Sequence, residues 1–257
     1  MSNKYERELG VRFLKNPPNH SSTGSNFGKY SYVHSYKNLG LFPKSKMTVQ
    51  PPEVQETYID IAGKDGELDL TESLTGFPTY TNREGKFEFT VMNRGTWDYV
   101  YSRLMNEIHG RKMYVVLDED SGWYYTGRLK VNSFKSKKNT ATIVVDGEFE
   151  PYKLAVGATG ERWLWDPFNF ETDYARDYSD LVVDGSTEYT IVGSRMPVRP
   201  QFKASTSGMT VTVNGTSYDL STSYSTPTNF PQLRDQEYTM TFGGIGTVSV
   251  RFDIGSL

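Results

Sequence analysis

The stretch 59–152 limits the possible folds more than any other part of the chain. It is a succession of short β segments, joined by glycine-rich turns and interrupted by one amphipathic helix. Residues 86–91 alternate apolar and polar side chains strictly, which predicts a strand with one buried face. The expected strands are 30–33, 57–61, 86–91, 113–117, 123–131, 140–145 and 148–152, with turns at 62–66, 118–122, 135–139 and 146–147. This pattern predicts a mainly β fold.

The one expected helix covers residues 96–109. Its apolar side chains recur at helical spacing and form a single stripe, so the helix should pack on a sheet. Thr96 is the expected N-cap, and Gly110 is the expected left-handed residue that ends the helix. The stripe consists of Trp97, Val100, Tyr101, Leu104, Met105 and Ile108.

Composition narrows the function classes. The 257 residues include no cysteine, which excludes disulfides, thiolate catalysis and cysteine-ligated zinc. The formal net charge of −3 shows no electrostatic footprint for nucleic acid. We expect no signal peptide, because the first residues lack an apolar core, and no segment approaches the ~18 apolar residues of a membrane span.

The chain divides into four expected parts. Residues 1–30 read as a polar N-terminal arm that is disordered or ordered against a neighbour, and 31–153 form the first domain. A small-residue linker, 154–162, leads to a second domain, 163–257. This half is almost purely β, with turn signals at Asp184-Gly185, Asn214-Gly215 and Gly243-Gly244, which favours a β-sandwich.

Candidate chemistry is sparse. Glu148 and Glu150 would share one face of a strand, as a pair of catalytic carboxylates could, although a solvated face beside Lys or Arg is the favoured interpretation. The acidic turn Asp118, Glu119 and Asp120 could hold calcium but is better explained as a hairpin tip. The histidines, His20, His34 and His109, are scattered, and no serine-nucleophile motif accompanies them, so a Ser/His/Asp triad is neither indicated nor ruled out.

Two further motifs have structural interpretations. Trp163 and Trp165 could stack on a sugar ring, but packing in a core or seam is favoured. Residues 243–246 (GGIG) lack the lysine of a phosphate loop and are expected to form a β-turn. We therefore predict no catalytic, metal-binding or cofactor-binding residue.

Six segments follow one another along the chain: 34–41 (HSYKNLGL), 58–72 (YIDIAGKDGELDLTE), 108–112 (IHGRK), 124–129 (YYTGRL), 163–170 (WLWDPFNF) and 244–250 (GIGTVSV). In this order they resemble the distal tail (Dit) proteins of siphophages that infect Gram-positive bacteria. The glycine turn departs from the usual family pattern, since Ala62 replaces a proline and Lys64 an arginine. The resemblance runs from about residue 31 to the end of the chain.

The resemblance implies a β-rich ring-forming N-terminal domain with one helix and a C-terminal galectin-like β-sandwich. It implies a non-enzymatic ring, usually of six copies, at the tail tip of the virion, assembled in the host cytoplasm. The implied partners are further copies of the chain, the major tail-tube protein, the tail-associated hub or lysin protein and receptor-binding proteins, with DNA passing through unbound. A carbohydrate-binding or receptor-recognition module is the alternative, and a β-sandwich hydrolase is a weaker one.

Overall fold

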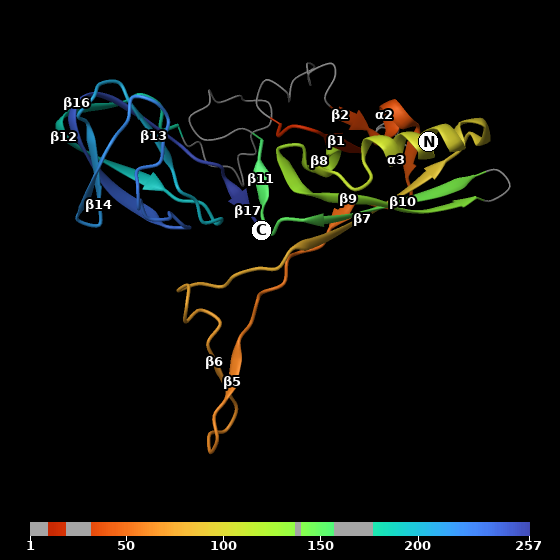
Figure 1. Cartoon of the computed structure of the whole chain (residues 1–257), viewed down its shortest axis with the longest axis horizontal. Coiled ribbons are helices and arrows are strands. Elements are labelled where there is room, and N and C mark those ends of the chain that lie inside the picture. Colours follow the sequence, from red (N-terminus) through yellow and green to blue (C-terminus); the bar gives the residue numbers. More distant parts are fainter. Residues whose placement is uncertain (1–9, 19–31, 137–139, 157–176) are drawn as a thin grey trace, which may run out of the picture.

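The fold consists of antiparallel sheets with little helix, as Figure 1 shows. The computed structural model describes residues 10–18, 32–136, 140–156 and 177–257. Its strands form a ten-stranded sheet, a five-stranded sheet and a two-stranded hairpin. The predicted mainly β fold class is confirmed. None of the helices within the described ranges is long and apolar enough to cross a membrane.

The ten-stranded sheet has the order β2-β1-β8-β9-β10-β7-β3, with β4 also on β7 and β11 joining β9 to β17. Its longest strand, β9, pairs with β8, β10 and β11 along different parts of its length. The strands are β1 (Val11–Leu14), β2 (Tyr32–His34), β3 (Leu41–Pro43), β4 (Thr48–Val49), β7 (Arg83–Val91), β8 (Lys112–Leu117), β9 (Trp123–Ser136), β10 (Ala141–Phe149), β11 (Lys153–Ala155) and β17 (Gly255–Ser256).

Strand β1 corrects the expectation of a polar arm over residues 1–30. It lies between β2 and β8, and the side chains of Val11, Phe13 and Leu14 are buried. Three apolar residues within four positions suffice for one buried strand, although the segments around them are polar. Residues 1–9 and 19–31 lie outside the described residues.

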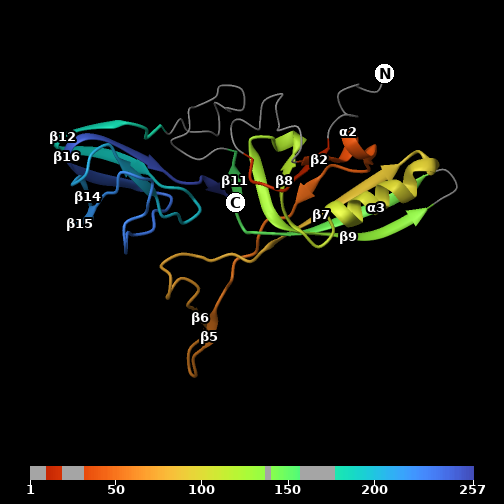
Figure 2. The ribbon, with the colours of Figure 1, turned by 45° about the horizontal axis from the view of Figure 1, so that its top comes forward.

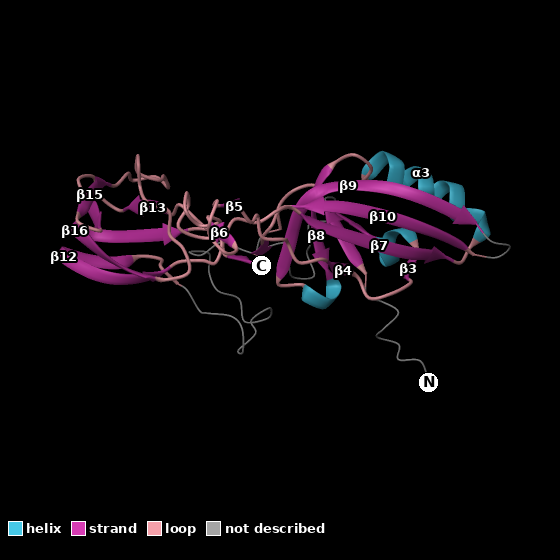
Figure 3. Ribbon diagram, turned by 90° about the horizontal axis from the view of Figure 1, so that it is seen from below, coloured by secondary structure: helices cyan, strands magenta, loops and turns pink. Residues whose placement is uncertain are grey.

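Helix α3 (Trp97–Glu107) covers one face of this sheet (Figure 3). The predicted stripe packs into the core, except that Met105 is exposed. Gly110 has the predicted positive φ, of 75°. Thr96 occupies the predicted N-cap position, but its side chain makes no capping hydrogen bond, because a 3-10 turn (Arg94–Thr96) precedes the helix. Asn93 caps that turn by accepting from the Gly95 amide.

The turn predicted at Asp146-Gly147 is also wrong, since both residues lie inside β10. Gly147 faces Gly85 on β7, while Gly127 on β9 faces Phe149. A Cβ atom added to any of these three glycines would clash with the Phe149 ring. The glycines therefore make room for a buried ring that lies against the sheet, and they mark close packing instead of a turn.

The five-stranded sheet has the order β12-β16-β14-β15, and β13 pairs with another part of β16. The hairpin predicted at Asn214-Gly215 is confirmed, with φ of 50° and 77°. Residues Gly185 and Gly244 face each other inside β12 and β16, both with positive φ, so the turns predicted there are wrong. The strands are β12 (Leu181–Val192), β13 (Gln201–Ala204), β14 (Thr210–Val213), β15 (Thr216–Asp219) and β16 (Glu237–Arg251).

Each large sheet has its own apolar core. The end of the chain returns to the first sheet, where Lys153 and Leu154 on β11 pair with Ser256 and Gly255 on β17. Leu154 and Ala155, which the predicted linker included, thus belong to a strand. The rest of the predicted boundary, 157–162, lies outside the described residues, and the division into domains stays a prediction.

Candidate assembly interface

Residues 53–80 form a hairpin arm that projects away from both large sheets (Figures 1 and 2). Its outer part pairs β5 (Tyr58–Asp60) with β6 (Glu67–Asp69) across the turn predicted at 62–66. Nearer the base, the Gln55 amide donates to the Thr79 carbonyl at 2.8 Å, and the Leu70 amide donates to the Thr57 carbonyl at 2.8 Å. The arm is therefore held in shape by its own backbone hydrogen bonds.

The arm exposes large apolar side chains. Leu74 is 99% exposed and Ile59 46% exposed, and every residue of β5 and β6 is exposed. A short two-stranded hairpin gains little stability alone, and clustered exposed apolar groups commonly mark interaction sites. The other exposed apolar side chains on the arm are Val54, Tyr58, Ile61 and Leu68.

The arm is also strongly acidic. It carries seven carboxylates and one cation, Lys64, so its formal charge is −6 in a chain whose net charge is −3. The nearby carboxylates of Glu56 and Asp69 raise the pKa of the Tyr58 hydroxyl. Such a surface would meet a basic partner surface favourably.

The base of the arm rests between the two large sheets. The Arg234 guanidinium, from the segment before β16, lies over the Phe77 ring. The rings of Tyr80 and Tyr152 meet edge to face, with centroids 5.9 Å apart. Burial raises the pKa of Tyr152, and burial lowers that of Arg234. The arm thus projects from a packed base.

Strand edges offer further pairing surface. Within the described ranges, the ordered path of the ten-stranded sheet ends at β2 and β3, and each of these strands pairs on one side. Exposed strand edges are usually paired or covered in assembled proteins.

The structure brings a serine, a histidine and an aspartate together, but in the wrong roles for catalysis. His34 caps α2 (Ser35–Leu39), where its Nδ1 accepts the amides of Tyr36 and Lys37 at 3.1 and 3.2 Å. Its Nε2 therefore carries the hydrogen and donates to Asp118 at 2.9 Å. The Ser35 hydroxyl is fully buried and accepts the Val11 amide, so this histidine cannot act as its base.

The acidic turn does not converge on a metal site. Asp118 pairs with Arg12 at 2.7 Å and with His34, while Glu119 and Asp120 pair with Lys46 and Lys153 at 3.6 and 2.9 Å. Burial raises the pKa of Asp118, but the His34 hydrogen bond and the Arg12 charge outweigh it, so the net pKa lies below its ordinary value. Among the residues that the structure describes, no group of three potential metal ligands occurs.

The remaining predicted candidates make local contacts. Glu150 directly follows the last residue of β10, and its amide still donates to the Thr126 carbonyl on β9 at 2.8 Å. The side chains of Glu148 and Glu150 are both exposed, on either side of the buried Phe149. Glu148 accepts from Asn82 at 2.8 Å, whereas Glu150 pairs with Lys112 at 2.7 Å and raises the pKa of that lysine. His109 Nδ1 accepts the Val131 amide at 3.1 Å. Residues 243–246 lie inside β16, and the β-turn expected there is wrong.

His20, Trp163 and Trp165 lie outside the described residues. Sequence reasoning placed a strand at 57–61 but missed that this hairpin is exposed. The signal was present, because seven carboxylates within residues 53–80 leave few positions that could be buried.

No protein-family model and no curated protein matches the chain. Its fold is similar to that of the distal tail proteins of phages. The particular solved structure is SPP1 Dit (gp 19.1), described as a paradigm of the hub adsorption apparatus in phages that infect Gram-positive bacteria. The match has a TM-score of 0.51 and 13% identity, and covers 84% of this chain and 92% of that chain. The expected resemblance is therefore confirmed for the fold.

Proposed function

We propose that this chain is a non-enzymatic structural protein of a siphophage tail tip, where it forms a ring of about six subunits. The ring would join the tail tube to the hub and leave a channel for DNA. The similarity of its fold to SPP1 Dit supports a role in a tail apparatus. The hairpin arm is the single observation that carries the assembly part of the proposal.

The arm suits a head-to-tail contact between copies. It projects from one side of the subunit and is held in shape before binding, so docking would order few residues. Its apolar side chains would lose their exposure against the next subunit. Because arm and receiving surface are different parts of the chain, repetition of the contact closes a ring when the rotation permits.

The candidate catalytic groups support a non-enzymatic role. His34, Asp118, Glu148 and Glu150 are each engaged by a neighbour that holds or neutralises them. In the proposed assembly the partners are copies of the chain, the tail-tube protein, the hub or lysin protein and receptor-binding proteins. The galectin-like character of the C-terminal β domain and its location in the virion belong to the same proposal.

Light scattering and negative-stain microscopy of the purified protein test the proposal. We expect a multimer near six subunits, or a smaller species that forms rings with tail-tube or hub proteins. Leu74→Ser on the arm should weaken assembly. Ile245→Ser removes a similarly exposed side chain, 74% exposed, from the C-terminal sheet and serves as the matched control.

The experiment distinguishes failure of the ring from failure of the arm contact. A wild-type protein that stays monomeric alone and with its tail partners would exclude the ring. Equal assembly of both variants would show that the arm does not make the contact, even if a ring forms.

A further inference from the structure

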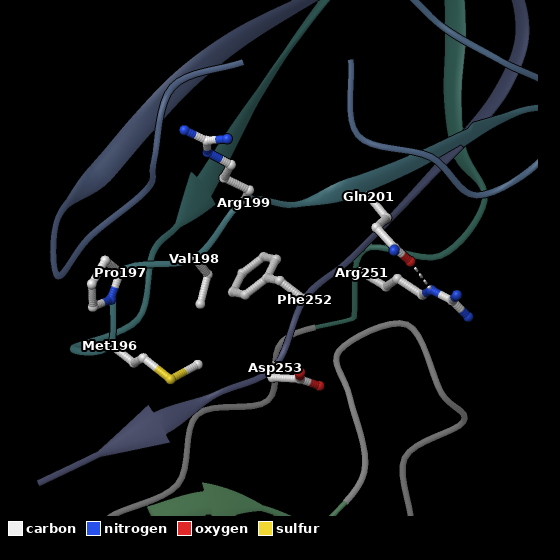
Figure 4. Close-up of a pocket in the computed structure, with 8 residues that line it drawn as sticks. All are labelled: Met196, Pro197, Val198, Arg199, Gln201, Arg251, Phe252 and Asp253. Atoms are coloured by element: carbon white, nitrogen blue, oxygen red, sulfur yellow. Dashed lines mark hydrogen bonds between the residues drawn. The ribbon is translucent and has the colours of Figure 1, made fainter. Parts of the chain in front are cut away.

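A cavity of about 470 Å³ opens at the side of the five-stranded sheet (Figure 4). Its apolar lining includes Met196, Pro197 and Phe252. Its polar lining includes Arg199 and the pair Gln201 and Arg251. The volume falls within the range of small-molecule sites, and polar and apolar groups contribute about equally to the accessible lining.

The Arg251 guanidinium is held in place before any ligand arrives. Gln201 and Arg251 face each other across β13 and β16, and Arg251 Nε donates to Gln201 Oε1 at 2.9 Å. Figure 4 shows this hydrogen bond beside Phe252. The guanidinium also lies 4.0 Å from the centroid of the Tyr224 ring. A guanidinium fixed on one edge and one face presents its other nitrogens for paired hydrogen bonds to an oxyanion.

The surroundings of Arg251 are locally positive. Lys203, two residues beyond Gln201 on β13, places its Nζ 5.8 Å from the same Tyr224 ring. In the ranges that the structure covers, no carboxylate lies within ion-pairing distance of Arg199, Lys203 or Arg251. The charged residues of the lining are Arg199, Arg251 and Asp253, so the cavity carries one excess positive charge in a chain of net charge −3.

We propose that this cavity binds a sugar unit that carries a phosphate or carboxylate group. The apolar side chains would contact the C–H face of the sugar ring, Arg251 would hold the anionic oxygens, and Arg199 would meet a second polar group. The proposal is independent of the ring, because none of its residues belongs to the hairpin arm.

Calorimetric titration of the whole chain at low salt tests this site with four probes: glucose 6-phosphate, glucuronate, glucose and inorganic phosphate. We expect at least one anionic sugar to bind about tenfold more tightly than glucose, as one charge-assisted contact provides. The preferred anionic sugar identifies the charged group. Arg251→Gln should weaken binding about tenfold.

Arg195→Gln is the matched control, because Arg195 lies between β12 and β13 as Arg199 does, but pairs with Asp235 at 3.8 Å and does not line the cavity. If Arg251→Gln lowers the melting temperature, Arg199→Gln replaces it. Equal binding of glucose and both anionic sugars, or no binding of any probe, overturns the proposal. So does unchanged affinity in the cavity variants, while inorganic phosphate binding as tightly as glucose 6-phosphate overturns the sugar part.

Discussion

His34 Nε2 lies 2.9 Å from Asp118 Oδ2, and this contact ties the start of helix α2 to the end of strand β8. Asp118 also accepts the Gly10 amide at 2.9 Å and pairs with Arg12. One nearly buried carboxylate thus joins three segments that are distant in sequence. In a different setting the same residue types perform catalysis, but here His34 and Asp118 hold the backbone of α2 and β1 in place.

Replacing Asp118 by Asn should lower the free energy of unfolding by about 2–4 kcal/mol, because it leaves Arg12 and His34 without their carboxylate. Denaturant unfolding measures the loss. Asp120→Asn removes a more exposed carboxylate, 38% exposed, and should cost less than about 1 kcal/mol. Similar losses in the two variants would mean that the buried contacts of Asp118 stabilise the fold no more than the exposed ion pair of Asp120.

The same pair predicts a pH dependence. The pKa of Asp118 is depressed in the folded protein, so its contribution to stability is complete above the ordinary value of about 3.9 and is lost as the pH falls through the lower folded value. The free energy of unfolding of the wild type should therefore fall more steeply than that of Asp118→Asn below about pH 4. Parallel curves would contradict this assignment.

The close packing of glycines around Phe149 leads to predictions about stability. Gly127→Ala should lower stability by about 1–3 kcal/mol, because the new methyl group would clash with the Glu148 carbonyl as well as the ring. Gly147→Ala meets mainly ring and leucine side-chain atoms, so Phe149→Leu should rescue it in part but should not rescue Gly127→Ala. Gly95→Ala, which has room for a methyl group, is the control. Equal rescue of both would contradict the proposed packing.

These glycines also show where sequence reasoning succeeds and fails. The alternation in 86–91 and the two-residue hairpin at Asn214-Gly215 are local properties, and both were predicted correctly. Whether Gly147 makes a turn or leaves room for a ring depends on β7 and β9, which lie far away in sequence. A local window contains no information about that packing.

The functional surfaces were less predictable for a similar reason. The strand on the arm was expected, but its exposure follows from the absence of a covering element in the described fold. At the cavity beside β13, the register between β13 and β16 places Gln201 opposite Arg251, and no sequence motif predicts this register. The pairing of His34 with Asp118 likewise depends on the placement of β1 between β2 and β8.

A further prediction tests which face of helix α3 is buried. Leu104 is fully buried, so Leu104→Asp should place an unpaired charge in the core and give insoluble or unfolded protein. Leu104→Ala, which keeps the protein measurable, should cost about 2–5 kcal/mol. Tyr99→Asp, at a position 61% exposed, should change stability by less than about 0.5 kcal/mol. A larger effect at Tyr99 than at Leu104 would show that the helix face is assigned wrongly.

The last prediction concerns the seam where β17 returns to the first sheet. The Ser194 hydroxyl is buried, accepts the Gly255 amide at 2.8 Å and donates to the Gly255 carbonyl at 3.0 Å. Because Gly255 also pairs with Leu154, this serine connects the segment after β12 to the first sheet. Ser194→Ala would leave both backbone groups without that partner and should lower the free energy of unfolding by about 1–3 kcal/mol.

Ser186→Ala, at an exposed position in β12, is the control and should leave the free energy of unfolding nearly unchanged. Hydrogen exchange should show faster opening of β11 and β17 in the Ser194 variant alone. Unchanged exchange at Leu154 would mean that the β11–β17 pair is held without the serine.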